Sequence, residues 1–283
     1  MHSNRRRRNV AALTLTATAF MFAGLVGIAA PAQAAPAKAS ISITSLKSSR
    51  GDQIVKGGKI TIGGKTSTSL RKRYLSVYVT RGRATSKLNI STRVSAASRF
   101  SASVPVNVNA GTVKYSLRFG GTSTVQKASA FKSVTVAQWF PLTEQEIVDY
   151  RSDESFIRHP DVEQNVSVAG KRYDSAIALR GPAQADNTSW SEWNLGYHCS
   201  SFDSKFGIGD DSSAGGRSVL SVSTDGSTRF STELGLGQTA SKTFSIQGAF
   251  RLRLTVLAIT DSASRPAFPA ARILCTSNPG PVD

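Results

Sequence analysis

Acidic side chains are almost absent from the first half of this chain. Residues 36–137 contain 18 Lys or Arg and a single acid, Asp52, whereas residues 138–283 contain 13 basic and 17 acidic residues. Charge of one sign over a whole module excludes a surface neutralised by its own ion pairs. Such asymmetry concerns partners and encounter rates rather than fold, and it predicts a basic module followed by a mildly acidic one.

Cysteine is almost absent too, with only Cys199 and Cys275. Two cysteines and one nearby histidine, His198, are too few and too widely spaced for a zinc site. An even pair in an exported protein predicts one disulfide. It would close a loop of about 75 residues, worth roughly 4 kcal/mol in the chain-entropy model. Two free buried thiols are the alternative.

Catalytic motifs are also missing. The sequence contains no G-x-S-x-G, H-E-x-x-H or P-loop pattern. His198 would need a close nucleophile and an orienting acid to take part in nucleophilic catalysis, so we interpret it as a surface or edge-strand residue. We therefore expect a protein without enzyme activity; an uncharacterised hydrolase is the alternative.

No long apolar run occurs after residue 30. Before it, Arg5–Arg8 form a basic region, residues 10–30 are apolar and small, and Ala32-Gln-Ala34 is an A-x-A cleavage site, the order of a signal peptide over residues 1–34. The alternatives are a transmembrane anchor and, for the export route, either Sec or twin-arginine. We expect a secreted or wall-associated protein without a membrane span after cleavage.

A helical period is lacking in residues 36–137, where apolar residues alternate with polar ones. Some seven short strands separated by Gly-rich turns predict an antiparallel β-sandwich. Residues 138–164 are expected to form a joint with a short helix capped by Thr143 and Glu146. Residues 165–276 are again β: Phe250–Val256 alternates as a half-buried strand, and Asp225-Gly226 predicts a hairpin turn.

Two family resemblances follow from motifs. The segments Lys56–Ile62, Arg99–Val104 and Val113–Phe119 make residues 36–137 resemble bacterial immunoglobulin-like domains. Residues 165–276 resemble the NPCBM/NEW2 family of carbohydrate-binding modules. The motifs shared with that family are Val166–Tyr173, Trp193–Leu195, Phe202–Asp211, Asp225–Gly226 and Gly248–Leu254. The two resemblances imply an all-β chain, in which an immunoglobulin-like β-sandwich precedes a galactose-binding-like jelly-roll β-sandwich. Residues 175–181 lack the Gly-rich segment and His of sugar-binding members.

Asp210 and Asp211 follow a Gly-Ile-Gly segment. As ligands they would bind a sugar hydroxyl or a structural Ca²⁺, because hard cations prefer clustered oxygens. As turn residues their carboxylates would bond nearby backbone amides, which we favour. They do not suit glycoside hydrolysis, since neighbours on an extended strand point to opposite faces.

Aromatic side chains crowd the stretch from 190 to 197. Rings at such positions either stack on sugars or pack in a core. We expect Trp193 and Tyr197 to point inward and Trp190, which lies between two serines, to be the surface residue that contacts a ligand.

The densest basic clusters are Arg71-Lys72-Arg73 and Arg81-Gly-Arg83. Arginine pairs bidentately with phosphate and carboxylate, so these five residues are candidates for contact with teichoic acid phosphates, uronic acids or extracellular DNA. A solvated face is the alternative. The sequence thus predicts a secreted binding protein for carbohydrate or anionic cell-envelope polymer. The alternative is a structural or protein-interaction module that binds no sugar.

Overall fold

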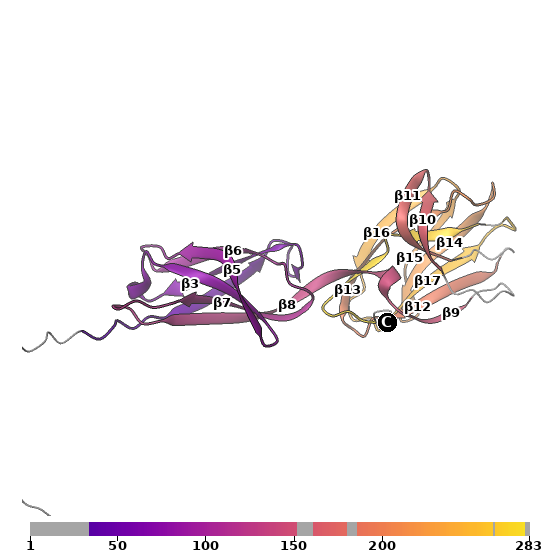
Figure 1. Cartoon of the computed structure of the whole chain (residues 1–283). Coiled ribbons are helices and arrows are strands. Elements are labelled where there is room, and N and C mark those ends of the chain that lie inside the picture. The colour runs from indigo at the N-terminus through magenta and orange to yellow at the C-terminus, as the bar shows by residue number, and fades with distance from the viewer. Residues whose placement is uncertain (1–33, 152–160, 180–185, 263, 281–283) are drawn as a thin grey trace, which may run out of the picture. The chain divides into compact units, whose positions relative to one another are not determined.

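The computed structural model of the chain describes residues 34–151, 161–179, 186–262 and 264–280 (Figure 1). The predicted signal peptide therefore lies almost wholly outside the described residues. Within them the only helical elements are two 3₁₀ turns, η1 (Thr68–Leu70) and η2 (Leu142–Glu144), and the strands pair almost entirely antiparallel. The all-β fold class predicted from the sequence is confirmed.

The N-terminal sandwich has two sheets around one core. Its strands are β1 (Ile41–Ser48), β2 (Ile54–Val55), β3 (Lys59–Thr66), β4 (Tyr74–Arg81), β5 (Ala84–Arg93), β6 (Arg99–Pro105), β7 (Gly111–Phe119) and the start of β8 (Ala128–Pro141). One sheet has the order β1-β3-β6, and the other runs β5-β4-β7-β8. The alternation of buried and exposed residues in β4 and β6 sends one apolar set inward. That set includes Leu75 and Val77 of β4 and Ala102 and Val104 of β6.

The C-terminal sandwich also has two sheets. Its strands are β9 (Ile147–Arg151), β10 (Asp161–Val168), β11 (Lys171–Ala178), β12 (Thr188–Asn194), β13 (Cys199–Ile208), β14 (Arg217–Thr224), β15 (Ser227–Gly235), β16 (Thr239–Ser245), β17 (Arg251–Ala258), β18 (Pro266–Pro269) and β19 (Arg272–Cys275). One sheet has the order β15-β14-β17-β12-β9; the other contains β10-β11-β18-β13-β19, with β16 on β13. Trp193, Phe202, Phe206 and Phe268 fill the core between them.

Strand β8 is shared by the two sandwiches. Its residues 128–136 pair with β7, and its residues 138–141 pair with β19. Phe140 packs against the C-terminal core.

The helix predicted after Thr143 is wrong. The chain forms η2 over Leu142–Glu144, with Pro141 rather than Thr143 at its N-cap and no side-chain cap, and then becomes β9. β9 pairs with the edge of β12, so hydrogen bonds to a neighbouring strand outweigh a local capping signal of about 1 kcal/mol.

The turn and period predictions in the C-terminal half are confirmed. Leu252, Leu254 and Val256 of β17 are fully buried, and Arg251 and Arg253 lie on the outer face. Asp225 and Gly226 have φ angles of +47° and +78° and connect β14 to β15, which is the conformation that makes Asp-Gly a hairpin signal.

Candidate functional site

An exposed tyrosine occupies the turn between β12 and β13. Gly196 and Tyr197 have φ angles of +56° and +64°, and the His198 N–H donates to the Leu195 carbonyl oxygen over 3.1 Å. A bulky aromatic residue rarely adopts a positive φ, and such conformations concentrate at functional sites. The Tyr197 side chain is nevertheless 66% exposed. The predicted inward orientation of Tyr197 is therefore wrong, because the turn breaks the strand alternation that buries Trp193 and Leu195.

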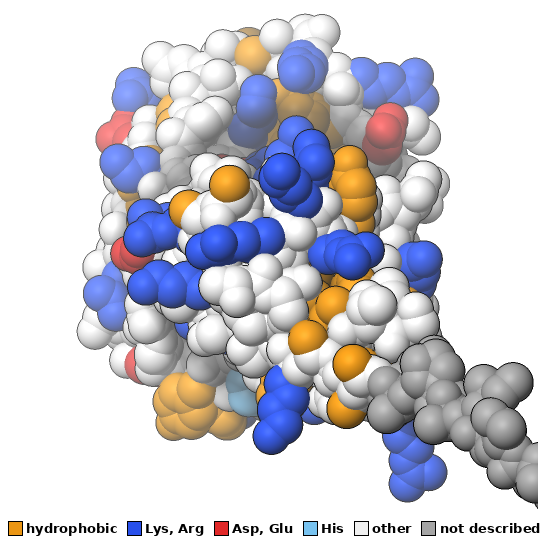
Figure 2. All heavy atoms as spheres, turned by 90° about the vertical axis from the view of Figure 1, so that its left-hand side faces the viewer, with side chains coloured by type: hydrophobic (Ala, Val, Ile, Leu, Met, Phe, Trp, Pro, Cys, Tyr) orange, Lys and Arg blue, Asp and Glu red, His pale blue; other side chains and the backbone are white. Residues whose placement is uncertain are grey.

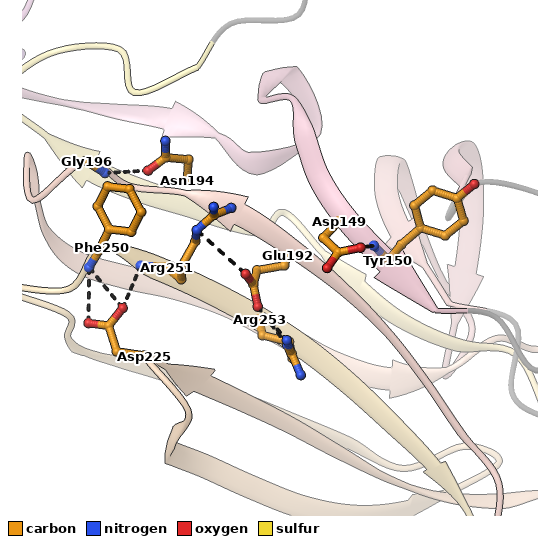
Figure 3. A network of polar contacts seen from close by, with 9 residues as sticks. All are labelled: Asp149, Tyr150, Glu192, Asn194, Gly196, Asp225, Phe250, Arg251 and Arg253. Atoms are coloured by element: carbon orange, nitrogen blue, oxygen red, sulfur yellow. Dashed lines mark hydrogen bonds and ion pairs between the residues drawn. The ribbon is translucent and has the colours of Figure 1, made fainter.

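Tyr197 packs against Phe250, the residue that precedes β17. Their ring centroids lie 5.1 Å apart with the planes tilted by 40°. The Asp225 carboxylate holds Phe250 in place: it accepts from the Phe250 N–H at 3.1 Å and from the Arg251 N–H at 2.8 Å (Figure 3). The Asn194 side-chain oxygen accepts from the Gly196 N–H at 3.0 Å. We call Tyr197 and Phe250 the aromatic surface.

A polar network begins beside the aromatic surface, on the outer face of β12 and β17. The Glu192 carboxylate accepts from Arg253 at 2.8 Å and lies 3.7 Å from the Arg251 guanidinium (Figure 3). Arg253 also lies over the Trp190 ring, 3.9 Å from its centroid. Trp190, the residue predicted as the surface contact, is half-buried, and a guanidinium lies over its ring. Its role as a ligand contact stays a prediction.

Asp210 and Asp211 are both exposed and both engaged. The Asp210 carboxylate accepts from the Gly170 N–H at 2.9 Å, and the Asp211 carboxylate forms an ion pair with Arg265. Arg265 also pairs with Glu163, and these carboxylates raise the pKa of the guanidinium. Asp210 thus binds a backbone amide, whereas Asp211 binds a side chain, and the choice between a turn role and a ligand role stays a prediction. In the described ranges, no three His, Cys, Asp or Glu gather as metal ligands.

The two predicted basic clusters lie at opposite ends of β4. Arg73 directly precedes the strand and Arg81 ends it, a separation of about 25 Å at the usual strand rise. Arg71 donates to the Ser98 hydroxyl at 3.0 Å, and Arg81 donates to the Ala110 carbonyl at 3.1 Å. All five residues of these clusters, including Lys72 and Arg83, are exposed. On the face of the molecule drawn in Figure 2, blue Lys and Arg side chains outnumber red acidic ones.

The predicted disulfide is present. Cys199 and Cys275 face each other on β13 and β19, with their Cα atoms 4.0 Å apart. His198, next to Cys199, is exposed, as expected for a surface histidine. No helix in the described part of the chain is long and apolar enough to cross a bilayer.

The family predicted from the C-terminal motifs is supported by comparison. Residues 132–267 match the model of the NPCBM/NEW2 domain. No curated protein matches the chain. No family match supports the predicted immunoglobulin-like relationship of residues 36–137, which stays a prediction.

Similar solved structures include carbohydrate-binding modules. The CBM51-2 and INT domains of ZmpB from Clostridium perfringens give a TM-score of 0.41 at 11% identity, covering 60% of this chain and 38% of that one. The CBM51 of Clostridium perfringens GH95, in complex with methyl-galactose, gives 0.37 at 18% identity over 48% and 99%. The CBM22 tandem of Paenibacillus barcinonensis Xyn10C gives 0.31 at 10% identity over 84% and 93%. Residues 132–267 are similar to the NPCBM/NEW2 domain, the family that the C-terminal motifs resemble.

Proposed function

We propose that the chain is a secreted, non-catalytic glycan-binding protein. Its C-terminal sandwich takes a sugar on the aromatic surface of Tyr197 and Phe250, and its basic N-terminal sandwich holds anionic polymers of the cell envelope. The NPCBM/NEW2 domain supports the first part, and the single acid among residues 36–137 supports the second.

The observation that carries the sugar assignment is the conformation of Tyr197. Holding an aromatic ring 66% exposed at a positive φ costs free energy in the unliganded protein. A sugar ring presents an apolar face that such a ring can cover. Burying the Tyr197 ring against a ligand offsets the backbone cost.

Polar groups for sugar hydroxyls lie next to Phe250, the second ring of the aromatic surface. The Arg251 guanidinium is 5.2 Å from the centroid of Phe250 and belongs to the network with Glu192. Binding sites combine an apolar surface with a few fixed polar groups. Glu192 is held by its hydrogen bond with Arg253, so this carboxylate is already ordered before a ligand arrives.

Secretion and the lack of catalysis are parts of the same proposal. The disulfide suits an oxidising compartment, which agrees with the predicted signal peptide. The carboxylates of Asp210 and Asp211 are both held by protein contacts. Activity on wall polysaccharide that is lost in Asp210→Asn would overturn this part.

A glycan array tests the sugar assignment, using residues 36–283, which form one compact unit. Tyr197→Asn removes the ring but keeps a residue that tolerates positive φ, and we expect it to weaken binding of neutral glycans about tenfold. Tyr74→Ala, a change of a similarly exposed ring in the N-terminal sandwich (62%), should leave that binding unchanged.

Two results would contradict this assignment. If no glycan binds with or without Ca²⁺, the sugar hypothesis is wrong. If Trp190→Ala abolishes binding while Tyr197→Asn does not, the ligand lies on the outer face of β12 instead. If the chain binds no glycan on the array but binds a protein partner stably, and this binding depends on Tyr197, the protein-interaction alternative is supported.

A further inference from the structure

A groove crosses the outer face of the N-terminal sandwich, at a place that neither predicted basic cluster occupies. It has a volume of about 950 Å³ and is lined by residues of β4, β5, β7 and β8. Strand register builds it: Tyr78 lies opposite Lys87 and Ser116, and Ser116 lies opposite Phe131. Lysine, hydroxyl and aromatic side chains therefore form one row across four strands.

The groove is cationic throughout. Lys87, Lys114, Arg118 and Lys127 line it, and no acid does. Among the described residues, none of these four forms an ion pair. A hollow lined by charge of one sign focuses the field and attracts counter-ions.

Two of the cations are held by aromatic rings. The Lys114 ammonium lies 4.4 Å from the Phe131 centroid, and the Arg118 guanidinium lies 4.3 Å from the Tyr78 centroid. Cation–π contacts restrict long side chains that would otherwise move freely. Lys114 and Arg118 are four residues apart on one strand, so their Cα atoms lie about 13 Å apart.

A buried hydroxyl lies between these two pairs. Ser116 is 5% exposed although it belongs to the outer face, and its oxygen has no hydrogen-bond partner among the described residues. Buried polar groups are normally paired. An unpaired hydroxyl between two cations can form a hydrogen bond with a ligand oxygen once the side chains of the two cation–π pairs move apart.

The groove favours a polysaccharide over a nucleic acid. Proteins that bind single strands stack bases on free aromatic faces, but here cations already lie over Tyr78 and Phe131. The rest of the lining offers hydroxyls, among them Ser76, Thr80, Thr85 and Ser129. Fixed cations beside hydroxyls suit a chain that carries both oxyanions and sugar hydroxyls.

We propose that this groove binds an acidic polysaccharide, with its carboxylate or phosphate oxygens on Lys114 and Arg118. The inference rests on the proposed anionic-polymer binding of the N-terminal sandwich and gives it a location. It moves the contact from the ends of β4, where the sequence placed it, to the middle of the sheet.

A matched pair of double variants of residues 36–283 tests the location. Lys114→Gln with Arg118→Gln removes two charges from the groove, and Arg71→Gln with Arg73→Gln removes two from the end of β4. The probes are polygalacturonate, poly(glycerol phosphate) and single-stranded DNA, titrated at equal ionic strength because screening alters all of them. Thermal unfolding confirms that each variant folds.

We expect the groove variant to bind polygalacturonate or poly(glycerol phosphate) at least about tenfold more weakly, and the control about twofold more weakly. The better of the two probes identifies the oxyanion. If both variants lose the same affinity, the groove is not the binding site, although the proposal that this sandwich binds anionic polymers still holds. If DNA binds most tightly of the three probes and the groove variant loses that binding, the ligand is not a polysaccharide. A wild-type chain that binds no probe would overturn the anionic-polymer part of the proposed function itself.

Discussion

Single side chains decide where each sandwich meets its surroundings. Tyr197 is exposed because a turn interrupts the alternation that buries Trp193. Tyr115 shows the opposite case, since it is 1% exposed in the N-terminal core and its hydroxyl has no partner among the described residues. An unpaired buried hydroxyl costs free energy that an apolar side chain of the same shape does not.

Tyr115→Phe should leave stability at neutral pH unchanged or slightly higher. Burial raises the pKa of the Tyr115 phenol above 10.0, so the folded state keeps its proton longer than the unfolded state. Stability linked to this group is complete below about pH 10 and falls as pH rises further. Urea unfolding at pH 7 and above pH 10 should show a smaller alkaline loss in the variant.

Tyr74→Phe is the control for this prediction, because Tyr74 is largely exposed. It should follow the wild-type pH dependence. The account of Tyr115 fails if both variants follow the same alkaline curve, or if Tyr115→Phe is destabilised at pH 7.

Some strands are held in place by long-range contacts that the local sequence pattern does not predict. Asp225 was recognised as a turn residue, yet its carboxylate also binds the amides of Phe250 and Arg251 at the start of β17. The β14–β15 turn therefore supports the aromatic surface.

Asp225→Ala should lower the free energy of unfolding by about 1–2 kcal/mol, because two charge-assisted hydrogen bonds at an exposed site are lost. Asp225→Asn keeps an acceptor and a residue that tolerates positive φ, so its loss should be less than half as large. Urea denaturation measures both. Equal losses would mean that the carboxylate does not anchor β17.

Strand periodicity predicted the elements well where one face is buried. The alternation in Phe250–Val256 and the Asp-Gly turn were confirmed. The Thr143 helix was not, because pairing of β9 with β12 is a contact between distant segments. The orientation of Tyr197 was also mispredicted. If the strand alternation that buries Trp193 and Leu195 continued, it would bury Tyr197 as well, but the chain turns at Gly196.

At the scale of the whole molecule, the charge asymmetry could be predicted from the sequence, but the groove could not. Counting acids identified residues 36–137 as a basic module. The groove depends on the register of β4, β5, β7 and β8, which brings Lys114 to Phe131 and Arg118 to Tyr78. The contiguous basic runs in the sequence lie instead at the two ends of β4.

The disulfide ties together distant parts of the C-terminal sandwich. Cys199 and Cys275 are 76 residues apart in sequence, so their loss should cost roughly 4 kcal/mol by loop entropy. Cys199→Ala with Cys275→Ala should lower the melting temperature by about 10 °C. Reductant should lower the wild-type value similarly and leave the variant unchanged. A wild-type chain that melts identically with and without reductant would contradict this.

The central claim is that each sandwich has its own ligand surface. It is tested most directly by titrating Tyr197→Asn and the Lys114→Gln, Arg118→Gln variant against two ligands: a neutral glycan from the array and an acidic polysaccharide. The account predicts a crossed result, in which Tyr197→Asn loses only the neutral glycan and the groove variant loses only the acidic polymer. Loss of both ligands in either variant, without loss of fold, would contradict it.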